Sequence, residues 1–267
     1  MTDAVAEHPL PMPMPAELRA WIADMTTVAA PGAVPGPYTF VPDPAVKLVV
    51  RTAADGRRDA MVVGPRTRAS YHAPERPASC VRLSLAPGAT RPLLGVPAVD
   101  LVGRVVPLDA LPGPATSRLA DRLRAFAPDE LAERLAEVLP RTLPKGADRE
   151  RAELLRAGVA ELSVREGRAP AQVAETARRL AVSERQLRKL FTEGIGLSPK
   201  HYARIERVRH VLARAAGVSW AELAVASGYY DQAHMTADFR SLMGVPPRAY
   251  VTGRLPGARP CQAWARG

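Results

Sequence analysis

One pattern occurs twice in the C-terminal half of the chain, and this repeat limits what the chain can fold into more than any other feature. The first copy ends at Tyr202 and the second at Tyr250. With Phe191 aligned on Phe239, the copies are offset by 48 residues and share a Gly, an apolar residue and a Pro, in that order, before the final Tyr. Such a period is typical of a small structural unit that is repeated. The sequence therefore predicts two similar units within residues 177–250.

Each copy carries the residues that two helices joined by a tight turn require. A small residue belongs where the helices cross, and Ala177 and Ala224 stand there. The turn four residues later needs a small residue or one with positive φ, which Ala181 and Gly228 supply. Side chains that accept hydrogen bonds favour the start of the second helix, whose inner face is apolar at the helical period. These residues are Ser183 and Asp231 at the starts, and Leu187, Leu190, Phe191, Met235 and Phe239 on the inner faces.

The charge of the chain is divided unevenly between its halves. Residues 1–144 hold 16 Lys and Arg against 15 Asp and Glu, whereas residues 145–267 hold 21 against 12, so the net charges are +1 and +9. A basic half joined to a neutral half indicates a module that binds a polyanion, attached to a different domain.

The N-terminal half shows a different pattern. Residues 1–15 are rich in Pro and are expected to form a flexible lead-in. Residues 16–29 fit either a short helix or a strand. From Pro31 onward, short β-branched runs alternate with Pro, Gly and Asp turns at a spacing of about ten to fifteen residues, which is typical of a small β barrel or sandwich. We predict a β-rich domain over residues 16–114 for effector sensing or dimerisation.

Residues 115–147 are predicted to connect the two halves. Apolar residues at helical spacing indicate helix over 115–139, broken at Pro128, and a linker containing Pro and Gly follows. A further helix over 148–166, capped by Asp148, begins the C-terminal domain. Amphipathic helices in this position either dimerise or pack on their own domain, and the sequence leaves both open.

The chain gives no sign of a membrane span, a signal peptide or a metal site. No apolar run approaches the roughly 20 residues that a span needs, and the start lacks the pattern of a signal peptide. Cys80 and Cys261 lie far apart and form no CxxC or Cys/His cluster. We therefore expect a cytoplasmic protein without metal, cofactor or catalytic residues, in which Cys80 is an inert thiol.

Residues 228–250 read GYYDQAHMTADFRSLMGVPPRAY, and this span follows a C-terminal signature of the AraC/XylS family of bacterial transcriptional regulators. Residues 148–252 resemble the DNA-binding domain of that family. The segments VVGP and LLGVPAVDLVGRVVPLDAL resemble the small β domain of an actinobacterial-type subgroup, which is cupin-like by analogy. The resemblance implies an α+β fold of two domains. The second domain is all-α, with two helix-turn-helix units joined by a long helix over 199–216.

The resemblance also implies how DNA is bound. Two recognition helices lie in successive major grooves about one helical turn apart, and the helix over 199–216 is the rigid spacer. Arg and Lys can reach guanine or phosphate, Gln can bind adenine with two hydrogen bonds, and Thr or Ala can contact a thymine methyl. The predicted DNA-binding residues are Ser183, Glu184, Arg185, Arg188 and Lys189 in the first unit, and Asp231, Gln232, Ala233, Thr236 and Ala237 in the second.

The two recognition faces are expected to have unequal duties. Arg is common in the family where Ala237 stands, and the neighbouring Asp238 would repel phosphate. The first unit is therefore predicted to discriminate between bases, while the second mainly positions the protein. Tyr229 is expected in the core, and the role of Tyr230 is left open.

We predict a sequence-specific transcriptional regulator that is not an enzyme. Its partner is double-stranded DNA, and the further candidates are a small-molecule effector, RNA polymerase and a second copy of the chain. One alternative is a DNA-targeted enzyme, such as an alkyl-accepting repair protein that uses Cys80. Another is a non-specific basic DNA binder, although its binding would need charge alone and not two differing faces. Residues 253–267 are predicted to form a flexible tail.

Overall fold

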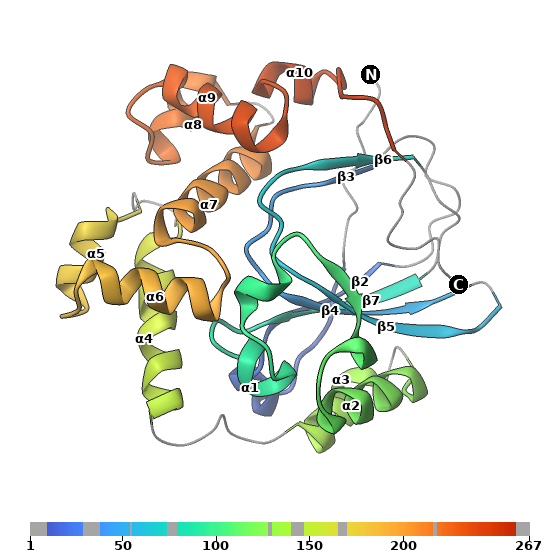
Figure 1. The fold of residues 1–267 in the computed structure, drawn as a ribbon. Coiled ribbons are helices and arrows are strands. Elements are labelled where there is room, and N and C mark those ends of the chain that lie inside the picture. The colour runs from blue at the N-terminus through green and yellow to red at the C-terminus, as the bar shows by residue number, and fades with distance from the viewer. Residues whose placement is uncertain are drawn as a thin grey trace.

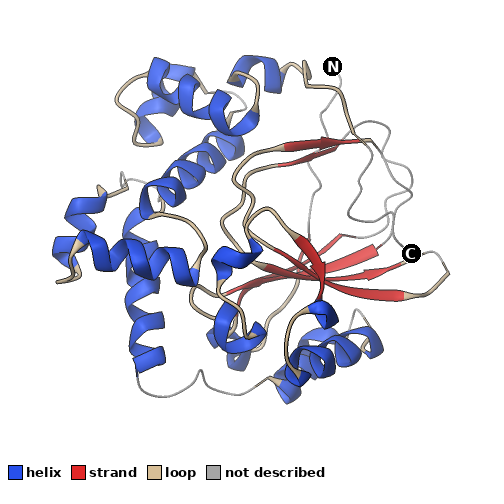
Figure 2. Cartoon of the chain, viewed as in Figure 1, coloured by secondary structure: helices blue, strands red, loops and turns tan. Residues whose placement is uncertain are grey.

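The computed structural model describes residues 10–28, 38–53, 55–73, 79–127, 130–139, 147–164, 170–215 and 218–259. Within these residues, strands and some helices make up the N-terminal part, and the C-terminal part is helical (Figure 2). This arrangement confirms the predicted α+β class with two domains. Within the described part of the chain, no helix is long and apolar enough to cross a membrane.

The N-terminal part is built on a six-stranded antiparallel sheet in the order β1-β2-β7-β4-β5-β8. Figure 1 labels β2, β4, β5 and β7 of this sheet. At its centre, Leu83 of β7 lies opposite Met25 of β2 on one side and Leu48 of β4 on the other, and all three are buried. The strands form an open sheet with β1 and β8 at its ends, where the sequence predicted a barrel or sandwich. The bounds are β1 Leu10–Pro11, β2 Ile22–Val28, β4 Lys47–Thr52, β5 Arg58–Val63, β7 Ser79–Leu85 and β8 Val105–Pro107.

The segment 16–29, which fitted either a helix or a strand, contains both. The 3₁₀ helix η1, Ala16–Ala20, leads directly into β2. Trp21, at the junction, and Leu18 are 1% exposed, so the two pieces are anchored in the same core. Residues after the junction form a strand because β7 supplies a backbone partner for almost every residue of β2.

The short helices of the N-terminal part pack around this sheet. The predicted break in the connector is found between α2 and α3, whose buried leucines join the N-terminal core. Both helices therefore pack on their own domain. The bounds are α1 Thr90–Leu94, η2 Ala98–Leu101, η3 Leu108–Ala110, α2 Pro114–Ala125 and α3 Leu131–Val138.

A two-stranded ribbon, β3 Tyr38–Phe40 with β6 Ser70–His72, is separate from the main sheet. It lies on the side of the sheet that faces the C-terminal helices (Figure 1). Val41 and Ala69, which flank its strands, pack against the C-terminal core. The ribbon therefore comes from the N-terminal half of the sequence but lies against the C-terminal half.

The C-terminal part has seven described helices around a second hydrophobic core. Its first helix begins at Ala147, so Asp148 lies in the first turn and is not the cap that the sequence indicated. A carboxylate there still faces the positive end of the helix. The bounds are α4 Ala147–Leu162, α5 Val173–Arg179, α6 Glu184–Gly194, α7 Pro199–Arg214, α8 Trp220–Ala226, α9 Gln232–Met243 and α10 Pro247–Val251.

The last described residues of the chain return to the N-terminal part. Arg259 pairs with β6: its N–H donates to Tyr71 O and its carbonyl accepts from Ala73 N–H, each at 3.0 Å. The segment 253–267 was predicted to be a flexible tail, but it is held in place up to this residue. Residues 260–267 lie outside the described residues.

Candidate nucleic-acid interface

The two repeat copies fold into two helix-turn-helix units with closely similar backbones. In the first, Val182 N–H donates to Ala177 O at 3.0 Å across the turn between α5 and α6. In the second, Tyr229 N–H donates to Ala224 O at 2.9 Å between α8 and α9. Ala177 and Ala224 are at most 2% exposed, as the crossing of two helices requires.

Both turns contain the left-handed residue that the sequence indicated. Gly228 has φ 74°, and Ala181 has φ 52°, the one positive φ of a non-glycine residue in the described chain. A left-handed conformation costs a residue with a Cβ about 1–2 kcal/mol. The first unit therefore folds against a local strain that the second avoids.

The recognition helices start as predicted. The Ser183 hydroxyl accepts the N–H of Gln186 at 3.1 Å, and the Gln186 side chain accepts the N–H of Ser183 at 2.9 Å, which completes a capping box on α6. Asp231 Oδ1 accepts the N–H of His234 at 2.7 Å and caps α9. Both caps are exposed, yet each already satisfies a helix N–H, so their first role is to begin the helix.

The two units also pack in the same way beneath each recognition helix. Phe191 packs edge-to-face on Tyr202 with ring centroids 5.5 Å apart, and Phe239 packs in the same way on Tyr250 at 6.0 Å. The remaining predicted inner-face residues are buried as well. These aromatic pairs explain why both copies end in Tyr, because each ring completes the core of its own unit.

The outward face of α6 is basic. The predicted residues Glu184, Arg185, Arg188 and Lys189 are all exposed. Lys189 Nζ lies 3.9 Å from a carboxylate oxygen of Glu193, while Arg185 and Arg188 form no ion pair with any described residue. Two guanidinium groups on one helix face are thus available for a base edge or a phosphate.

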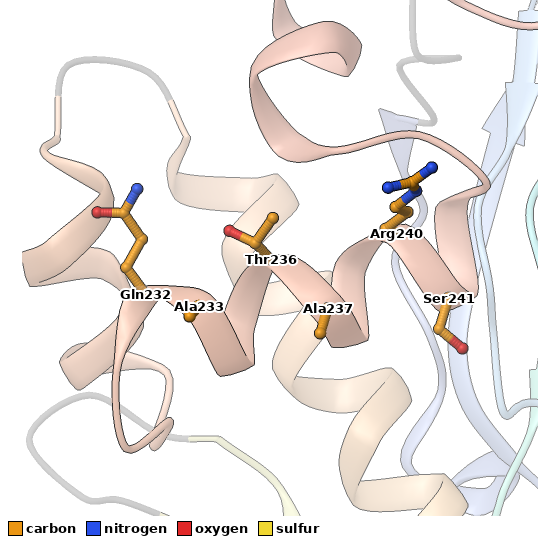
Figure 3. Close-up of a pocket in the computed structure, with 6 residues that line it drawn as sticks. All are labelled: Gln232, Ala233, Thr236, Ala237, Arg240 and Ser241. Carbon is orange, nitrogen blue, oxygen red and sulfur yellow. The ribbon is translucent and has the colours of Figure 1, made fainter.

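The outward face of α9 is less charged and is hollowed. A wide, open hollow of about 820 Å³ runs along the helix. In Figure 3 the residues that line it form two rows, with Gln232, Thr236 and Arg240 in one and Ala233, Ala237 and Ser241 in the other. The first row carries hydrogen-bonding side chains, and the second carries small ones that let another surface approach the helix closely.

Two of these lining residues, Arg240 and Ser241, were missed by the sequence analysis. Both are exposed and lie one turn beyond Thr236 and Ala237. Continuing the helical spacing of four would have found them. Arg240 also adds a cation to a face whose predicted residues, apart from the cap Asp231, are uncharged.

The expectation that Asp238 would repel phosphate is wrong. Asp238 is 8% exposed and points away from the outer face, with Oδ1 2.9 Å from Arg204 Nε and Oδ2 3.9 Å from Arg207 Nη2. Because a buried carboxylate needs compensating charge, the two arginines of α7 hold it between the helices. This ion pair ties the recognition helix to the spacer helix.

Arg204 and Arg207 of the spacer helix α7 make contacts inside the protein. Arg204 also donates to Ser241 Oγ at 3.3 Å, and the Arg207 guanidinium lies 4.9 Å from the ring centroid of Tyr229. Tyr229 is 5% exposed, which confirms its place in the core, whereas Tyr230 is 91% exposed beside the start of α9. Burial raises the pKa of the Tyr229 hydroxyl, so it stays neutral.

Two family models match the chain. Residues 176–253 match a model described as a helix-turn-helix domain, and residues 12–107 match a domain of unknown function (DUF6597). The first match confirms the predicted helix-turn-helix domain within residues 176–253, the part of the chain on which the resemblance to the AraC/XylS family rests. No curated protein matches the chain.

Several solved structures are similar to parts of the chain. A probable AraC family transcriptional regulator from Rhodopseudomonas palustris CGA009 has 20% identity and a TM-score of 0.33, covering 39% of this chain and 99% of its own. The DNA-binding domain of AdpA, in complex with a target DNA, has 22% identity and a TM-score of 0.33, covering 39% and 90%. ToxT from Vibrio cholerae O395 has 11% identity and a TM-score of 0.40, covering 81% and 93%.

Proposed function

We propose that the protein is a sequence-specific transcriptional regulator that places α6 and α9 in successive major grooves. The observation that carries the proposal is the repeat itself. The two units have similar interiors and similar backbones, but their outward faces differ. The face of α6 is basic, and the face of α9 carries small and polar side chains. A non-specific DNA binder would need only charge, whereas unlike faces suit a site made of two different short boxes.

The spacer helix supports this arrangement. In Figure 1 α7 lies between α6 and the pair α8–α9, and it contacts both recognition helices. It begins at Pro199 behind the N-cap Ser198, whose hydroxyl accepts the N–H of His201 at 3.2 Å. A helix of 16 residues is about 24 Å long, which suits recognition helices roughly one DNA turn, about 34 Å, apart.

Selection of bound sequences from random double-stranded DNA tests the proposal. We expect a site of two short boxes with centres about 10 base pairs apart. Affinity for that site should fall steeply with salt, with a log–log slope of about 0.9 per phosphate neutralised. Recovery of DNA without a shared motif, or an affinity that hardly changes with salt, would contradict the proposal.

The N-terminal part is proposed to sense a small molecule or to mediate dimerisation. Its packed core supports a stable domain, but the hollow beside β7 has a volume of only about 20 Å³, room for about one water molecule. An effector would therefore bind elsewhere or by moving α3. Thermal shifts with metabolite mixtures and the solution mass of the full chain distinguish the two roles. We also propose that the protein is cytoplasmic and that it contacts RNA polymerase.

The alternative of an alkyl-accepting enzyme finds little support at Cys80. This residue is half-buried on β7, and apolar side chains such as Val50, Phe126 and Leu131 line the same small hollow. A nucleophilic thiol instead needs an electropositive and accessible setting. Reaction with iodoacetamide should be slow in the folded protein, and rapid single-site labelling of Cys80 would revive the alternative.

A further inference from the structure

The end of the second recognition helix is completed by residues from the N-terminal half. The last four carbonyls of any helix lack partners within the helix. At the end of α9, Arg240 O accepts the N–H of Gly244 at 2.9 Å in the usual left-handed cap. The last two carbonyls of α9 accept from the N-terminal half instead: Leu242 O accepts Ala69 N–H at 2.8 Å, and Met243 O accepts the Tyr71 hydroxyl at 2.6 Å.

These two donors belong to the β3–β6 ribbon. Tyr71 lies in β6 and Ala69 directly precedes it, about 170 residues before the carbonyls that they contact. Tyr71 is 8% exposed, and burial raises the pKa of its hydroxyl to about 12, so it remains a hydrogen-bond donor at neutral pH. The contact is therefore a buried hydrogen bond between the two halves of the chain.

The same ribbon is attached to the spacer helix and to α10. Arg209 of α7 lies 3.3 Å from Asp43 Oδ2 and donates to Pro42 O at 3.3 Å, in the segment that follows β3. Thr39 of β3 lies beside the Tyr250 side chain of α10: burial raises the pKa of the Tyr250 hydroxyl, and Thr39 lowers it by less. Each attachment is to the second unit or to the spacer. The first unit contacts the N-terminal part elsewhere, where Gly196 approaches Ala98 of η2.

The ribbon holds α9 without covering its outward face. Gln232, Ala233, Ala237 and Arg240 stay exposed, while the ribbon contacts Leu242 and Met243 at the C-terminal end of the helix. The contact therefore restrains how α9 tilts on α7, and it leaves the face that would meet DNA open.

We propose that the β3–β6 ribbon is a brace for the second unit and that Tyr71 is a positioning residue for the box that α9 binds. The proposal rests on the proposed function. It gives the N-terminal half a direct part in DNA recognition: the second box is bound tightly only while the ribbon holds α9, and the first box is bound independently of it.

Binding by the full chain to two DNA probes tests the brace. One probe is the two-box site recovered by selection, and the other is the same DNA with the α9 box scrambled. Tyr71→Phe removes one hydroxyl and leaves Met243 O without its donor, which lowers the fraction of molecules with α9 in the binding orientation. We expect affinity for the two-box probe to fall about fivefold to tenfold and affinity for the scrambled probe to stay unchanged.

Two further variants separate positioning from stability. Arg209→Gln removes the ion pair between α7 and Asp43, and it should weaken binding to the two-box probe alone, by a smaller factor. Tyr202→Phe is the matched control, because it also removes one hydroxyl, which lies 2.9 Å from Ser163 Oγ in the same core but away from the ribbon. It should lower the melting temperature but change the affinity for the two probes by the same factor.

The outcomes distinguish the brace from the function on which it rests. Equal losses on both probes for Tyr71→Phe, or no loss on either, overturn the brace while DNA recognition stands. If the unmodified chain does not prefer the two-box probe to unrelated DNA, the proposed function itself fails.

Discussion

The two helix-turn-helix units resemble each other inside and differ outside. Inside, Phe191 on Tyr202 and Phe239 on Tyr250 form the same edge-to-face pair. Outside, α6 carries guanidinium groups, while α9 carries a row of small residues beside a polar row. Close packing allows few solutions for the interior of such a unit. An exposed face has no such restriction, so that is where two copies can acquire different partners.

The units also differ in what supports them. The first unit contains the strained residue Ala181, while the second has Gly228 at the same place. The second unit instead depends on contacts from outside itself, through Arg204 of the spacer and Tyr71 of the ribbon. The two units are therefore similar in sequence, but the second relies more on contacts from the rest of the protein.

The largest expected effect tests the likeness of the interiors. Phe191→Ala and Phe239→Ala each empty a fully buried ring site, and each should lower the free energy of unfolding by about 3–5 kcal/mol. Urea titrations followed by circular dichroism measure both losses. A loss in one variant more than twice that in the other would show that the two cores are not equivalent.

The next effect tests the difference between the faces. Arg188→Ala should weaken binding to the selected site by about 1–3 kcal/mol, and Gln232→Ala by less than about 1 kcal/mol, if the first unit discriminates bases. Mobility shifts at fixed salt give both values. Equal losses would contradict the prediction that the two units have unequal duties. That prediction no longer rests on Asp238, which is buried, and Arg240 adds a cation to the second face.

Acid should loosen the second unit through Asp43. Burial alone would raise the pKa of Asp43, but the charges of Lys47 and Arg209, with hydrogen bonds from Lys47 and Ala45, outweigh it and lower the pKa to about 2. Because the folded state favours the carboxylate, this stabilisation is present above pH of about 4 and is lost as the pH falls toward 2. It amounts to about 2 kcal/mol.

Unfolding free energies at several pH values between 2 and 6 measure this term. The Asp43→Asn variant should lose most of the pH dependence in that window and should approach the unmodified chain at the acid end. If both proteins lose stability in parallel as the pH falls, other carboxylates dominate and the assignment to Asp43 is wrong.

The smallest effect concerns the two turns. Ala181→Gly relieves the left-handed strain, but the added glycine gains freedom in the unfolded chain, so we expect a net gain of about 0.5–1 kcal/mol. Gly228→Ala should destabilise by at least about 1 kcal/mol, because its new Cβ would lie 2.7 Å from Pro170 Cδ as well as at positive φ. The melting temperature should therefore rise for Ala181→Gly and fall for Gly228→Ala. Shifts of the same sign would contradict this prediction.

Much of the C-terminal half could be predicted because its signals are local. The caps Ser183 and Asp231 and the turn residues Ala181 and Gly228 act within a few positions of themselves. The outward residues of α6 could be assigned from the helical period for the same reason. Arg240 escaped because the predicted face was ended one turn too early.

The direction of Asp238 could not be predicted, since it depends on the arginines of another helix. The two readings of residues 16–29 also stayed open, because β2 is a strand only through its pairing with β7. In each case the deciding partner is distant in the sequence.

The sequence by itself determined the repeat, its two cores, and which residues of α6 and most of α9 face outward. Periodicity and local hydrogen bonding are enough for that, since each unit is a short, self-contained packing problem. Only the tertiary structure decided that a ribbon from the N-terminal half would complete the end of α9. The carbonyls of Leu242 and Met243 needed donors, and no pattern within the helix reveals that Ala69 and Tyr71 provide them.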